Sequence, residues 1–352
     1  MSDTATTTRR TSPGGSDRPL TEAYDTALLD LDGVVYAGPD AIEHAVESLD
    51  AARTAGMRLA YVTNNASRPP KAVAEHLTEL GVPAEASDVI NSAQAAARLV
   101  ADKVPAGSKV LVIGGAGLLE ALAERGLVPV RSLDEDPVAV VQGFDPTVGW
   151  QQLAEAAYAV QRGLPWVASN TDLTIPTARG IAPGNGALVA AVRTATGAEP
   201  EVAGKPMPPM HRETVLRTGA ERPLVVGDRL DTDIEGAHNG GVDSLLVFTG
   251  VTTPAQLLAA PPEHRPTYLA ADLRGLLLAQ PEVTGSAGGF ACGGWTAVVR
   301  DGVLRLDGMG EDRYDGLRAL CAAAWTALDG TGEGSGADGA VDGRKALADL
   351  GF

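Results

Sequence analysis

The chain has 352 residues, of which 44% are hydrophobic and 21% charged, and its formal net charge is −17. This is the composition of a globular protein that is long enough for two or three domains. The negative charge argues against a nucleic-acid-binding protein and against attraction to anionic membranes. The five histidines show no zinc-binding spacing, and no apolar run is long enough to cross a bilayer.

The two cysteines, Cys292 and Cys321, are too few for a disulfide-built secreted fold. Residues 1–22 begin with a segment rich in Thr, Ser and Gly that contains Arg9 and Arg10 but no apolar core. Such a segment is typical of a disordered tail rather than of a signal peptide. We therefore expect a cytoplasmic protein without a membrane or nucleic-acid partner.

After the tail, short apolar runs alternate with helical patterns. Ala27-Leu28-Leu29 predicts a buried strand, the spacing of apolar residues over 41–55 predicts a helix, and Arg58–Val62 predicts a second strand before a helix over 71–80. This β-α-β order predicts a parallel sheet with right-handed crossovers. Ligands of such sheets bind outside the carboxyl ends of the strands.

The first predicted strand ends in two acids, Asp30 and Asp32, followed by Gly33. Two carboxylates on one side of a strand end repel each other, and a bound cation or anionic-ligand chemistry would explain why both are present. The alternative is an ordinary Asp-x-Asp-Gly turn at the surface.

Two further polar stretches stand at element boundaries. Thr63-Asn64-Asn65 follows the second strand and either holds an anion or caps the next helix. Lys205 lies between Gly204 and Pro206, which restrict where its ammonium points; the stretch lacks the pattern of a P-loop, and the alternative is an exposed lysine.

A third buried strand, Pro223–Gly227, ends at Asp228, and Asp231 and Asp233 follow closely. Together with Asp30 and Asp32 these acids form a set of hard oxygen ligands suited to Mg²⁺. Asp231 also has a simpler interpretation, because an acid at a helix start stabilises the helix dipole.

Residues 105–200 form an α/β unit of their own in this prediction, with strands over 109–113, 137–141 and 166–169 and helices over 151–161 and 187–196. The glycines after the first of these strands lack the third glycine of a dinucleotide-binding turn, because position 120 is Glu, so a structural turn is favoured. A polar loop that contains Asn170, Asp172 and Arg179 either contacts substrate or is a plain turn before a capped helix.

The four stretches around Asp30, Thr63, Lys205 and Asp228, in this order, resemble the haloacid dehalogenase (HAD) superfamily, and the insertion between the second and third resembles its type IIA phosphatases. The resemblance implies a Rossmann-like α/β core with a parallel sheet and an inserted α/β cap domain. The core would comprise residues 23–104 and 201–281, and the cap residues 105–200.

The C-terminal part, residues 282–352, lies outside that resemblance. A hairpin is predicted to turn at Asp301-Gly302, followed by a helix over 314–328 and a flexible linker over 330–343. An HAD phosphatase with such a module resembles the actinobacterial glycerol-3-phosphate phosphatases, whose tail is similar to part of an acetyltransferase (GNAT) fold. Because no R-x-x-G-x-G/A loop for coenzyme A is present, we expect a small α+β module with a packing or interface role.

The resemblance also implies a mechanism. Asp30 would be the nucleophile that forms an aspartyl-phosphate, and Asp32 the general acid and base. Mg²⁺ would be held by Asp30, the backbone carbonyl of Asp32 and Asp228, with Asp233 orienting these ligands. Lys205 and the loop side chains would hold the phosphoryl group, and this set comprises Gly33, Thr63, Asn64, Asn65 and Lys205.

The acid at position 32 favours phosphate esters over halides, because a halide leaving group needs no proton. Among small phosphomonoesters, glycerol 3-phosphate is the preferred substrate, because the combination of an HAD part and a C-terminal module resembles the glycerol-3-phosphate phosphatases. Pyridoxal 5′-phosphate, a nucleoside monophosphate and 2-phosphoglycolate remain alternatives. We expect the loop over 174–183 to select among them, and a homodimer is expected by resemblance. Two other classes stay open: a phosphate-binding regulatory module with an inert site, and a protein in which the C-terminal module is the functional part.

Overall fold

The computed structural model describes residues 10–177, 179–286, 288–330 and 341–352. The chain divides into two compact units. Unit 1 contains the residues up to 59 and those from 220 to 352, and unit 2 contains residues 60–219. Among the helices of the described ranges, none has an apolar stretch of membrane-spanning length.

Unit 1 is built on parallel strands in the order β15-β14-β13-β1. Each strand is short and almost wholly buried, as expected for a parallel sheet that helices cover on both faces. The register pairs Leu29 at the end of β1 with Val226 of β13. The elements of this part are α1 (Leu20–Ala23), β1 (Thr26–Leu29), β2 (Tyr36–Ala37), β3 (Asp40–Ala41), α2 (Ala45–Thr54), β13 (Pro223–Gly227), η3 (Leu230–Ile234), α9 (Glu235–Gly240), β14 (Asp243–Val247), α10 (Pro254–Leu258), η4 (Pro262–His264), β15 (Tyr268–Ala270) and η5 (Leu273–Leu277).

The segment before β1 differs from the expectation of a disordered tail over residues 1–22. Gly14 N–H donates to Thr267 O at 2.8 Å, Ser16 forms a bridge with Gln280, and Arg10 pairs with Asp243 at 3.1 Å. Residues 1–9 lie outside the described ranges. Part of the polar segment is therefore tied to the sheet by backbone hydrogen bonds, which its composition does not reveal.

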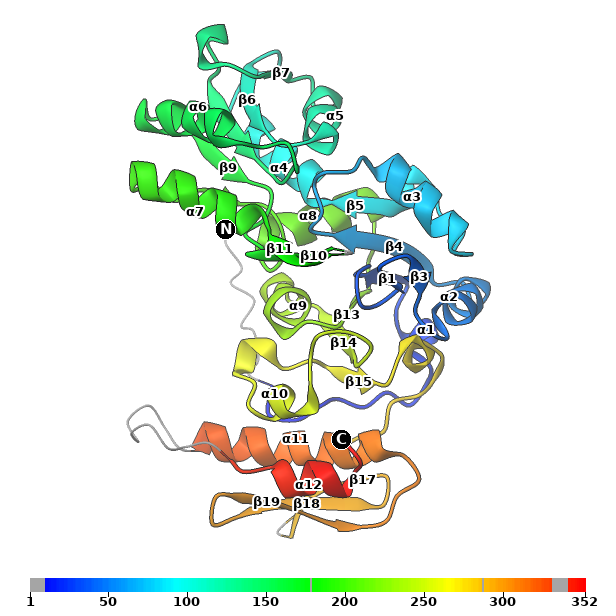
Figure 1. The fold of residues 1–352 in the computed structure, drawn as a ribbon. Coiled ribbons are helices and arrows are strands. Elements are labelled where there is room, and N and C mark those ends of the chain that lie inside the picture. The colour runs from blue at the N-terminus through cyan, green and yellow to red at the C-terminus, as the bar shows by residue number, and fades with distance from the viewer. Residues whose placement is uncertain (1–9, 178, 287, 331–340) are drawn as a thin grey trace, which may run out of the picture. The chain divides into compact units, whose positions relative to one another are not determined.

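The C-terminal module of unit 1 is an antiparallel sheet in the order β16-β17-β18-β19, packed on the long helix α11. In Figure 1, α11 lies between this sheet and the elements α10 and β15. The hairpin turns at Asp301-Gly302 as predicted, both with positive φ. The predicted linker over 330–343 falls largely outside the described ranges. The elements are β16 (Thr284–Ser286), β17 (Gly289–Cys292), β18 (Trp295–Arg300), β19 (Val303–Gly308), α11 (Arg313–Gly330) and α12 (Arg344–Asp349).

The module and the parallel sheet share one hydrophobic core. Twelve consecutive residues of α11, Tyr314–Trp325, are buried. Their apolar side chains join Leu257, Leu258 and Leu269 in a single cluster. At the same interface Trp325 Nε1 donates to Leu257 O at 3.0 Å, and Arg265 pairs with Asp329 at 2.8 Å. The expected packing role of the module is thus visible in its core.

Unit 2 contains a second parallel sheet, in the order β12-β9-β8-β6-β7. Helices α6 and α7 pack against each other, as do α4 and α5, and the two pairs cover opposite faces of the sheet (Figure 1). The predicted α/β architecture, with a parallel core sheet, a second α/β sheet and a small α+β module, is confirmed. The elements are β4 (Arg58–Thr63), α3 (Pro70–Glu79), η1 (Ala86–Asp88), β5 (Val89–Asn91), α4 (Ser92–Ala101), β6 (Lys109–Ile113), α5 (Ala116–Glu124), β7 (Val128–Val130), η2 (Leu133–Glu135), β8 (Ala139–Gln142), α6 (Trp150–Gln161), β9 (Trp166–Ala168), β10 (Thr174–Thr177), β11 (Gly180–Pro183), α7 (Asn185–Thr196), β12 (Glu201–Val202) and α8 (Pro208–Thr218).

Two features of unit 2 go beyond the prediction. The segment over 174–183, expected as a loop, forms the antiparallel hairpin β10–β11. Residues 60–104, assigned to the core, share a compact unit with residues 105–200, assigned to the cap. The reason is that α4 packs on α5 and on β8 and β9.

A buried carboxylate holds three helices of unit 2 together. Glu213 of α8 is fully buried and pairs with Arg98 of α4, with Arg125 at the end of α5 at 2.7 Å, and with Arg217 one turn further along α8 at 2.5 Å. Burial alone would raise the pKa of Glu213, but hydrogen bonds from Arg98 and Arg217 and the charges of the arginines outweigh it. The pKa of Glu213 is therefore lower than the ordinary value of 4.5.

We predict that Glu213→Gln lowers the free energy of unfolding of unit 2 by about 3–5 kcal/mol, because it leaves three guanidinium groups around a neutral side chain. Urea denaturation followed by circular dichroism measures this. The matched control is Glu201→Gln, which removes a half-exposed partner of Lys103 and should cost less than about 1 kcal/mol.

The pH dependence of stability follows from the lowered pKa. The Glu213 contribution is fully present above the ordinary glutamate pKa of 4.5 and is lost as the pH falls through the lower folded-state value. Wild type should therefore lose its advantage over Glu213→Gln at acidic pH. Equal unfolding free energies of the two proteins at pH 7 would contradict the assignment.

Candidate metal and phosphate site

Three carboxylates of unit 1 meet at the ends of two adjacent strands. Asp30 directly follows β1, and its N–H donates to Val226 O of β13 at 2.9 Å. Asp228 directly follows β13 and Asp233 lies in η3; both are buried, whereas Asp30 is half-buried. One carboxylate oxygen of each residue lies within 4.8 Å of the others. The sequence prediction that Asp30 and Asp228 lie together thus agrees with the geometry.

A loop after β14 holds this cluster, and we call Thr249–Thr252 the clasp loop. Val251 N–H donates to Asp228 Oδ2 at 2.7 Å, and Thr249 Oγ1 donates to Gly33 O at 2.6 Å. A Cβ at Gly250 would lie 2.0 Å from Asp228 Oδ2, so only glycine allows this approach. The clasp loop therefore fixes both the Asp228 carboxylate and the turn after Asp30.

Gly33 is needed at its position for two reasons. Its φ is +86°, a conformation that side chains other than glycine rarely adopt, and a Cβ would lie 2.7 Å from Asp228 Oδ2. Asp32, one residue earlier, is exposed and forms a bridge with Tyr36. The turn thus presents Asp32 outward while its backbone closes on Asp228.

The Asp233 carboxylate also belongs to this cluster. Its position suits a metal ligand as well as the orienting role that the sequence predicts. Its Oδ2 also accepts Arg229 N–H at 3.2 Å. Asp231, in contrast, is exposed and pairs with the Arg229 guanidinium at 2.8 Å, in keeping with the simpler interpretation of that acid.

In unit 2 the Thr63-Asn64-Asn65 stretch ends β4 in a hydrogen-bonded turn. Thr63 Oγ1 accepts Asn65 N–H at 3.1 Å, and Asn65 Oδ1 accepts both Ser67 N–H at 2.9 Å and Ser67 Oγ at 2.7 Å. Because the side-chain oxygens of Thr63 and Asn65 act as acceptors here, their hydroxyl and amide hydrogens are the groups suited to bind an anion.

Asn64 connects this turn to the Lys205 segment. Its Oδ1 accepts Lys205 N–H at 2.8 Å, and its Nδ2 donates to Lys205 O at 3.1 Å and to both carboxylate oxygens of Asp172 at 3.3 Å. Its backbone carbonyl accepts the amide of Asn170 at 2.7 Å. Sequence analysis listed Asn64 among the phosphate-binding groups; in the structure its amide braces the backbone of Lys205.

Lys205 turns its ammonium back toward the same turn, where Nζ donates to Val62 O at 3.1 Å. An ammonium has three donors, so this contact is compatible with binding an anion as well. Lys205 and Thr63 are therefore attached to the same end of β4; that they bind one ligand stays a prediction.

The three residues of the polar cap loop have different environments. Asn170 is buried, and its carbonyl accepts Asn185 Nδ2 at 2.7 Å, so it braces the loop. Asp172 is half-buried against Asn64. Arg179 is exposed at the tip of the β10–β11 hairpin. Of the three, Arg179 is the one with an exposed side chain.

The glycines after β6 have the structural role that was favoured for them. Gly117 N–H donates to Ser67 O at 3.3 Å, and a Cβ at Gly117 would lie 2.4 Å from Ala66 O. The turn at the start of α5 therefore packs against the segment that follows Asn65, and a dinucleotide is not needed to explain it.

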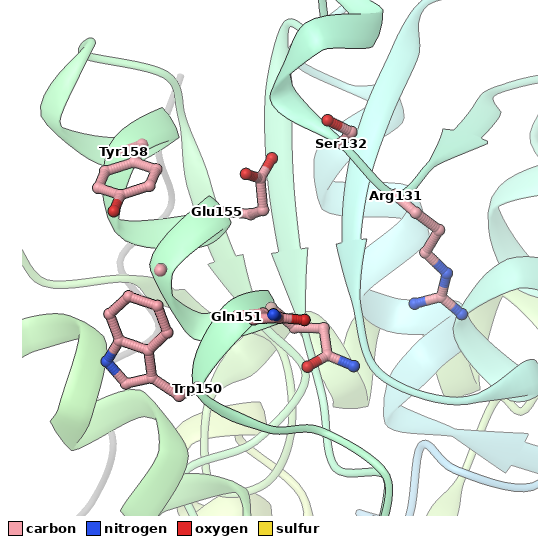
Figure 2. A pocket seen from close by; sticks show the side chains of 8 residues that line it. Arg131, Ser132, Trp150, Gln151, Glu155 and Tyr158 are labelled. Carbon is pink, nitrogen blue, oxygen red and sulfur yellow. The ribbon is translucent and has the colours of Figure 1, made fainter.

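A shallow hollow of about 460 Å³ lies on the outer side of α6. Figure 2 shows Trp150, Glu155 and Tyr158 projecting from the helix and Arg131 on the opposite side. Trp150 is 77% exposed and Tyr158 48% exposed. None of the predicted site residues lines this hollow, so it is a surface feature separate from the residues described above.

The C-terminal module offers little to an acyl carrier. The segment between β19 and α11 carries Glu311 and Asp312, so the start of α11 is acidic. Asp312 Oδ1 accepts Tyr314 N–H at 2.8 Å and so occupies that helix start with a carboxylate. A pyrophosphate would be repelled there.

Sequence reasoning missed the clasp loop. Thr249, Gly250 and Val251 follow a strand without any acid, amide or lysine that would mark a site. The available signal was positional: the loop follows the carboxyl end of a predicted strand of the same parallel sheet, where binding loops gather.

Comparison with known proteins agrees with this layout. The haloacid dehalogenase-like hydrolase family matches residues 27–128, a HAD-hydrolase-like family residues 202–276, and a GCN5-related N-acetyltransferase-like domain residues 292–352. The D-glycerol 3-phosphate phosphatase of Mycobacterium tuberculosis is 46% identical over 315 residues, which are 88% of each chain.

Two solved structures of a glycerol phosphate phosphatase from Mycobacterium tuberculosis are similar in fold. The complex with calcium has a TM-score of 0.85 at 42% identity and covers 95% of this chain and 98% of the other. The complex with magnesium has a TM-score of 0.81 at 44% identity and covers 88% and 92%.

Proposed function

Because the chain belongs to the haloacid dehalogenase-like hydrolase family, we propose that it is a Mg²⁺-dependent phosphomonoester hydrolase whose substrate is glycerol 3-phosphate. The observation that carries the proposal is the cluster of Asp30, Asp228 and Asp233 at the carboxyl ends of β1 and β13. Carboxylates gathered at this edge of a parallel sheet suit a cation that in turn binds phosphate.

The donor set fits Mg²⁺. All three groups are carboxylates, and one oxygen of each lies within 4.8 Å of the others. Neighbouring oxygens around one octahedral Mg²⁺ are roughly 3–4 Å apart, so small shifts would bring these oxygens to one ion. We assign Asp30, Asp228 and the Asp32 carbonyl as ligands, and Asp233 as a further ligand or as the group that orients them. When bound, the ion neutralises charge that would otherwise repel phosphate from the carboxylates.

The first chemical step uses Asp30. One of its carboxylate oxygens attacks phosphorus, a new Asp30–phosphorus bond forms, and the bond from phosphorus to the alcohol oxygen breaks. Asp32 donates its proton to that oxygen, so the alcohol leaves neutral. The exposed position of Asp32 supports this role, because its carboxyl group must reach the alcohol oxygen of a substrate that enters from solvent.

The second step releases phosphate. A water molecule attacks phosphorus, Asp32 takes its proton, and the bond to Asp30 breaks, which restores both carboxyl groups. We assign backbone N–H groups near Gly33, the hydroxyl of Thr63, the amide of Asn65 and the ammonium of Lys205 to the phosphoryl oxygens by the resemblance of their motifs. The N–H of Gly33 itself donates to Tyr36 O at 2.9 Å. Asn64 supports Lys205 in this scheme.

Glycerol 3-phosphate is the preferred substrate because the similar Mycobacterium tuberculosis protein is named a D-glycerol 3-phosphate phosphatase. The similarity extends over 88% of this chain, which contains both a hydrolase part and an acetyltransferase-like part. Pyridoxal phosphate and nucleoside monophosphates are the alternatives. The β10–β11 hairpin is the candidate selector, since it exposes Arg179 and, with 74% exposure, Ile181. An inert phosphate-binding regulator is the other class, and the assembled carboxylate cluster favours the enzyme.

We also propose a cytoplasmic homodimer. Cys292 and Cys321 are free and buried, and burial raises the pKa of both thiols, that of Cys292 to about 12, which suits reduced and unreactive cysteines. The exposed Trp150 and Tyr158 on α6 form the candidate dimer surface. Glu155 projects from the same helix, and Arg131 lies on the opposite side of the hollow (Figure 2). In a two-fold dimer this same surface of each copy would meet its partner.

We predict that Asp30→Asn lowers kcat by more than about 10⁴-fold, the scale observed when an enzyme loses its nucleophile. Phosphate release from glycerol 3-phosphate in the presence of Mg²⁺ measures this. The control is Asp231→Asn, which changes an exposed acid of the neighbouring segment and should leave activity unchanged. Wild-type rates for Asp30→Asn would support the inert regulator instead.

A screen of small phosphomonoesters with Mg²⁺ and with EDTA tests the substrate and the ion together. Glycerol 3-phosphate should give the highest kcat/KM, and EDTA should abolish release of phosphate from every substrate. A clear preference for pyridoxal phosphate or a nucleotide would replace the proposed substrate and keep the chemistry, whereas full activity in EDTA would contradict the assigned ligands.

For the dimer, Trp150→Glu should convert the protein to a monomer, because it places a charge in an aromatic surface that the partner would bury. Light scattering after size-exclusion chromatography gives the mass. The control is Leu216→Glu on α8, another exposed apolar residue of unit 2 outside the α6 surface. A wild-type monomer, or a dimer that survives Trp150→Glu, would refute this surface.

A further inference from the structure

Three aromatic rings connect the C-terminal module to the strand that precedes the clasp loop. Phe248, which follows β14, packs against Tyr314 at the start of α11, with ring centroids 5.6 Å apart. Tyr314 in turn meets Phe352 edge-on, with centroids 5.4 Å apart. Tyr314 is buried, whereas Phe248 and Phe352 are half-buried. We call these three residues the aromatic stack.

Arg313 fixes the far side of the stack. Its guanidinium lies 4.4 Å from the centre of the Phe352 ring and 5.3 Å from that of Tyr314, and its Nη1 donates to Gly351 O at 3.1 Å. Cations over aromatic faces are attracted by the ring electrons. The module therefore holds Tyr314 from behind while its ring faces Phe248.

Phe248 directly precedes the clasp loop. Its N–H donates toward the carbonyls of Ala270 and Ala271, which ties its backbone to the end of β15. The next residues make the contacts with Gly33 and Asp228 described above. The start of the clasp loop is thus held in two ways: by the hydrogen bonds of the Phe248 backbone to the end of β15 and by the contact of the Phe248 ring with Tyr314.

The second segment of the cluster rests on the same module. Ile234 at the end of η3 is part of the hydrophobic core that contains Leu317 and Leu320 of α11, and Leu230 packs against it. Asp233 lies between Leu230 and Ile234 in this short segment. Two of the three carboxylates are therefore held by elements that α11 supports.

We propose that the C-terminal module positions the metal-binding carboxylates, and that Tyr314 is the positioning residue through which it does so. The inference rests on the proposed function for the identity of the ion. Tyr314 touches neither Asp228 nor substrate in this account; it acts by holding Phe248, which fixes the clasp loop and with it the hydrogen bond from Val251 to Asp228. The acetyltransferase-like module would thus contribute to the hydrolase by positioning these carboxylates rather than by binding coenzyme A.

The test compares Mg²⁺ binding by full-length variants in isothermal titration calorimetry, with no substrate present. Tyr314→Ala should weaken the Mg²⁺ Kd by about tenfold, the lower end of the effect of removing groups that orient metal ligands. Tyr314→Phe keeps the ring and should restore wild-type affinity. Tyr314→Leu replaces the ring with another apolar side chain, and it is used if the alanine variant does not fold. It should bind Mg²⁺ more weakly than Tyr314→Phe.

The matched control is Trp325→Phe in the same helix. Trp325 is fully buried and lies 11 residues further along α11, about 16 Å at 1.5 Å per residue, where it contacts Leu257. It should lower the melting temperature of the protein without changing the Mg²⁺ Kd. A merely stabilising module predicts that both variants lower the melting temperature and that neither changes Mg²⁺ affinity.

The proposal is overturned if Tyr314→Ala and Tyr314→Leu bind Mg²⁺ as wild type does, or if Trp325→Phe weakens binding as much as they do. A failure of the proposed function looks different. In that case wild type would bind Mg²⁺ and hydrolyse no phosphomonoester, while the ranking of the Tyr314 variants in Mg²⁺ affinity would still stand. If wild type bound no Mg²⁺, the assigned metal and this inference would both fall.

Discussion

The repulsion among three carboxylates is a constraint that unit 1 has to accommodate. At 4.8 Å, the upper limit of the distances among their oxygens, and an effective dielectric constant of about 20, two such charges repel by roughly 3 kcal/mol. Asp228 and Asp233 are buried, so solvent screens them poorly. A fold with a net stability of roughly 5–15 kcal/mol tolerates such a cluster only where backbone donors and a cation offset the repulsion. The surrounding elements are best understood as the source of these donors.

The donors come from segments that are distant in sequence. Val251 N–H reaches Asp228, Arg229 N–H reaches Asp233, and the register of β1 against β13 sets Asp30 beside them. Each of the two hydrogen bonds comes from a backbone N–H group, which stabilises a carboxylate without adding a full positive charge. Backbone donors also move little, since they belong to strand ends and short turns. Fixed backbone donors of this kind are what a pre-organised site requires.

Sequence reasoning found the parts whose chemistry shows in single residues. Asp30, Thr63 and Asp228 follow strands that hydrophobic runs predict, and Lys205 stands out because it lies between Gly204 and Pro206. Asp301-Gly302 predicts its hairpin by the turn preference of these two residues. The β10–β11 hairpin escaped because Pro176 and the polar residues around it do not resemble a strand. The hydrogen bond from Lys205 N–H to Asn64 Oδ1 joins residues 141 positions apart. An asparagine at a strand end can bind either a phosphate or the backbone of another segment, and the sequence does not distinguish these two roles. Such assignments depend on tertiary contacts.

The C-terminal module resembles an acetyltransferase-like domain, but the start of its long helix is poorly suited to an anionic carrier. Glu311 and Asp312 precede that helix, and their charges would repel a pyrophosphate there. The sheet and α11 nevertheless retain the apolar faces that such a fold must bury, and they bury them against β15, α10 and η3. Because this shared core also contains the neighbours of Asp228 and Asp233, selection for a stable core and selection for a rigid metal site act on the same side chains.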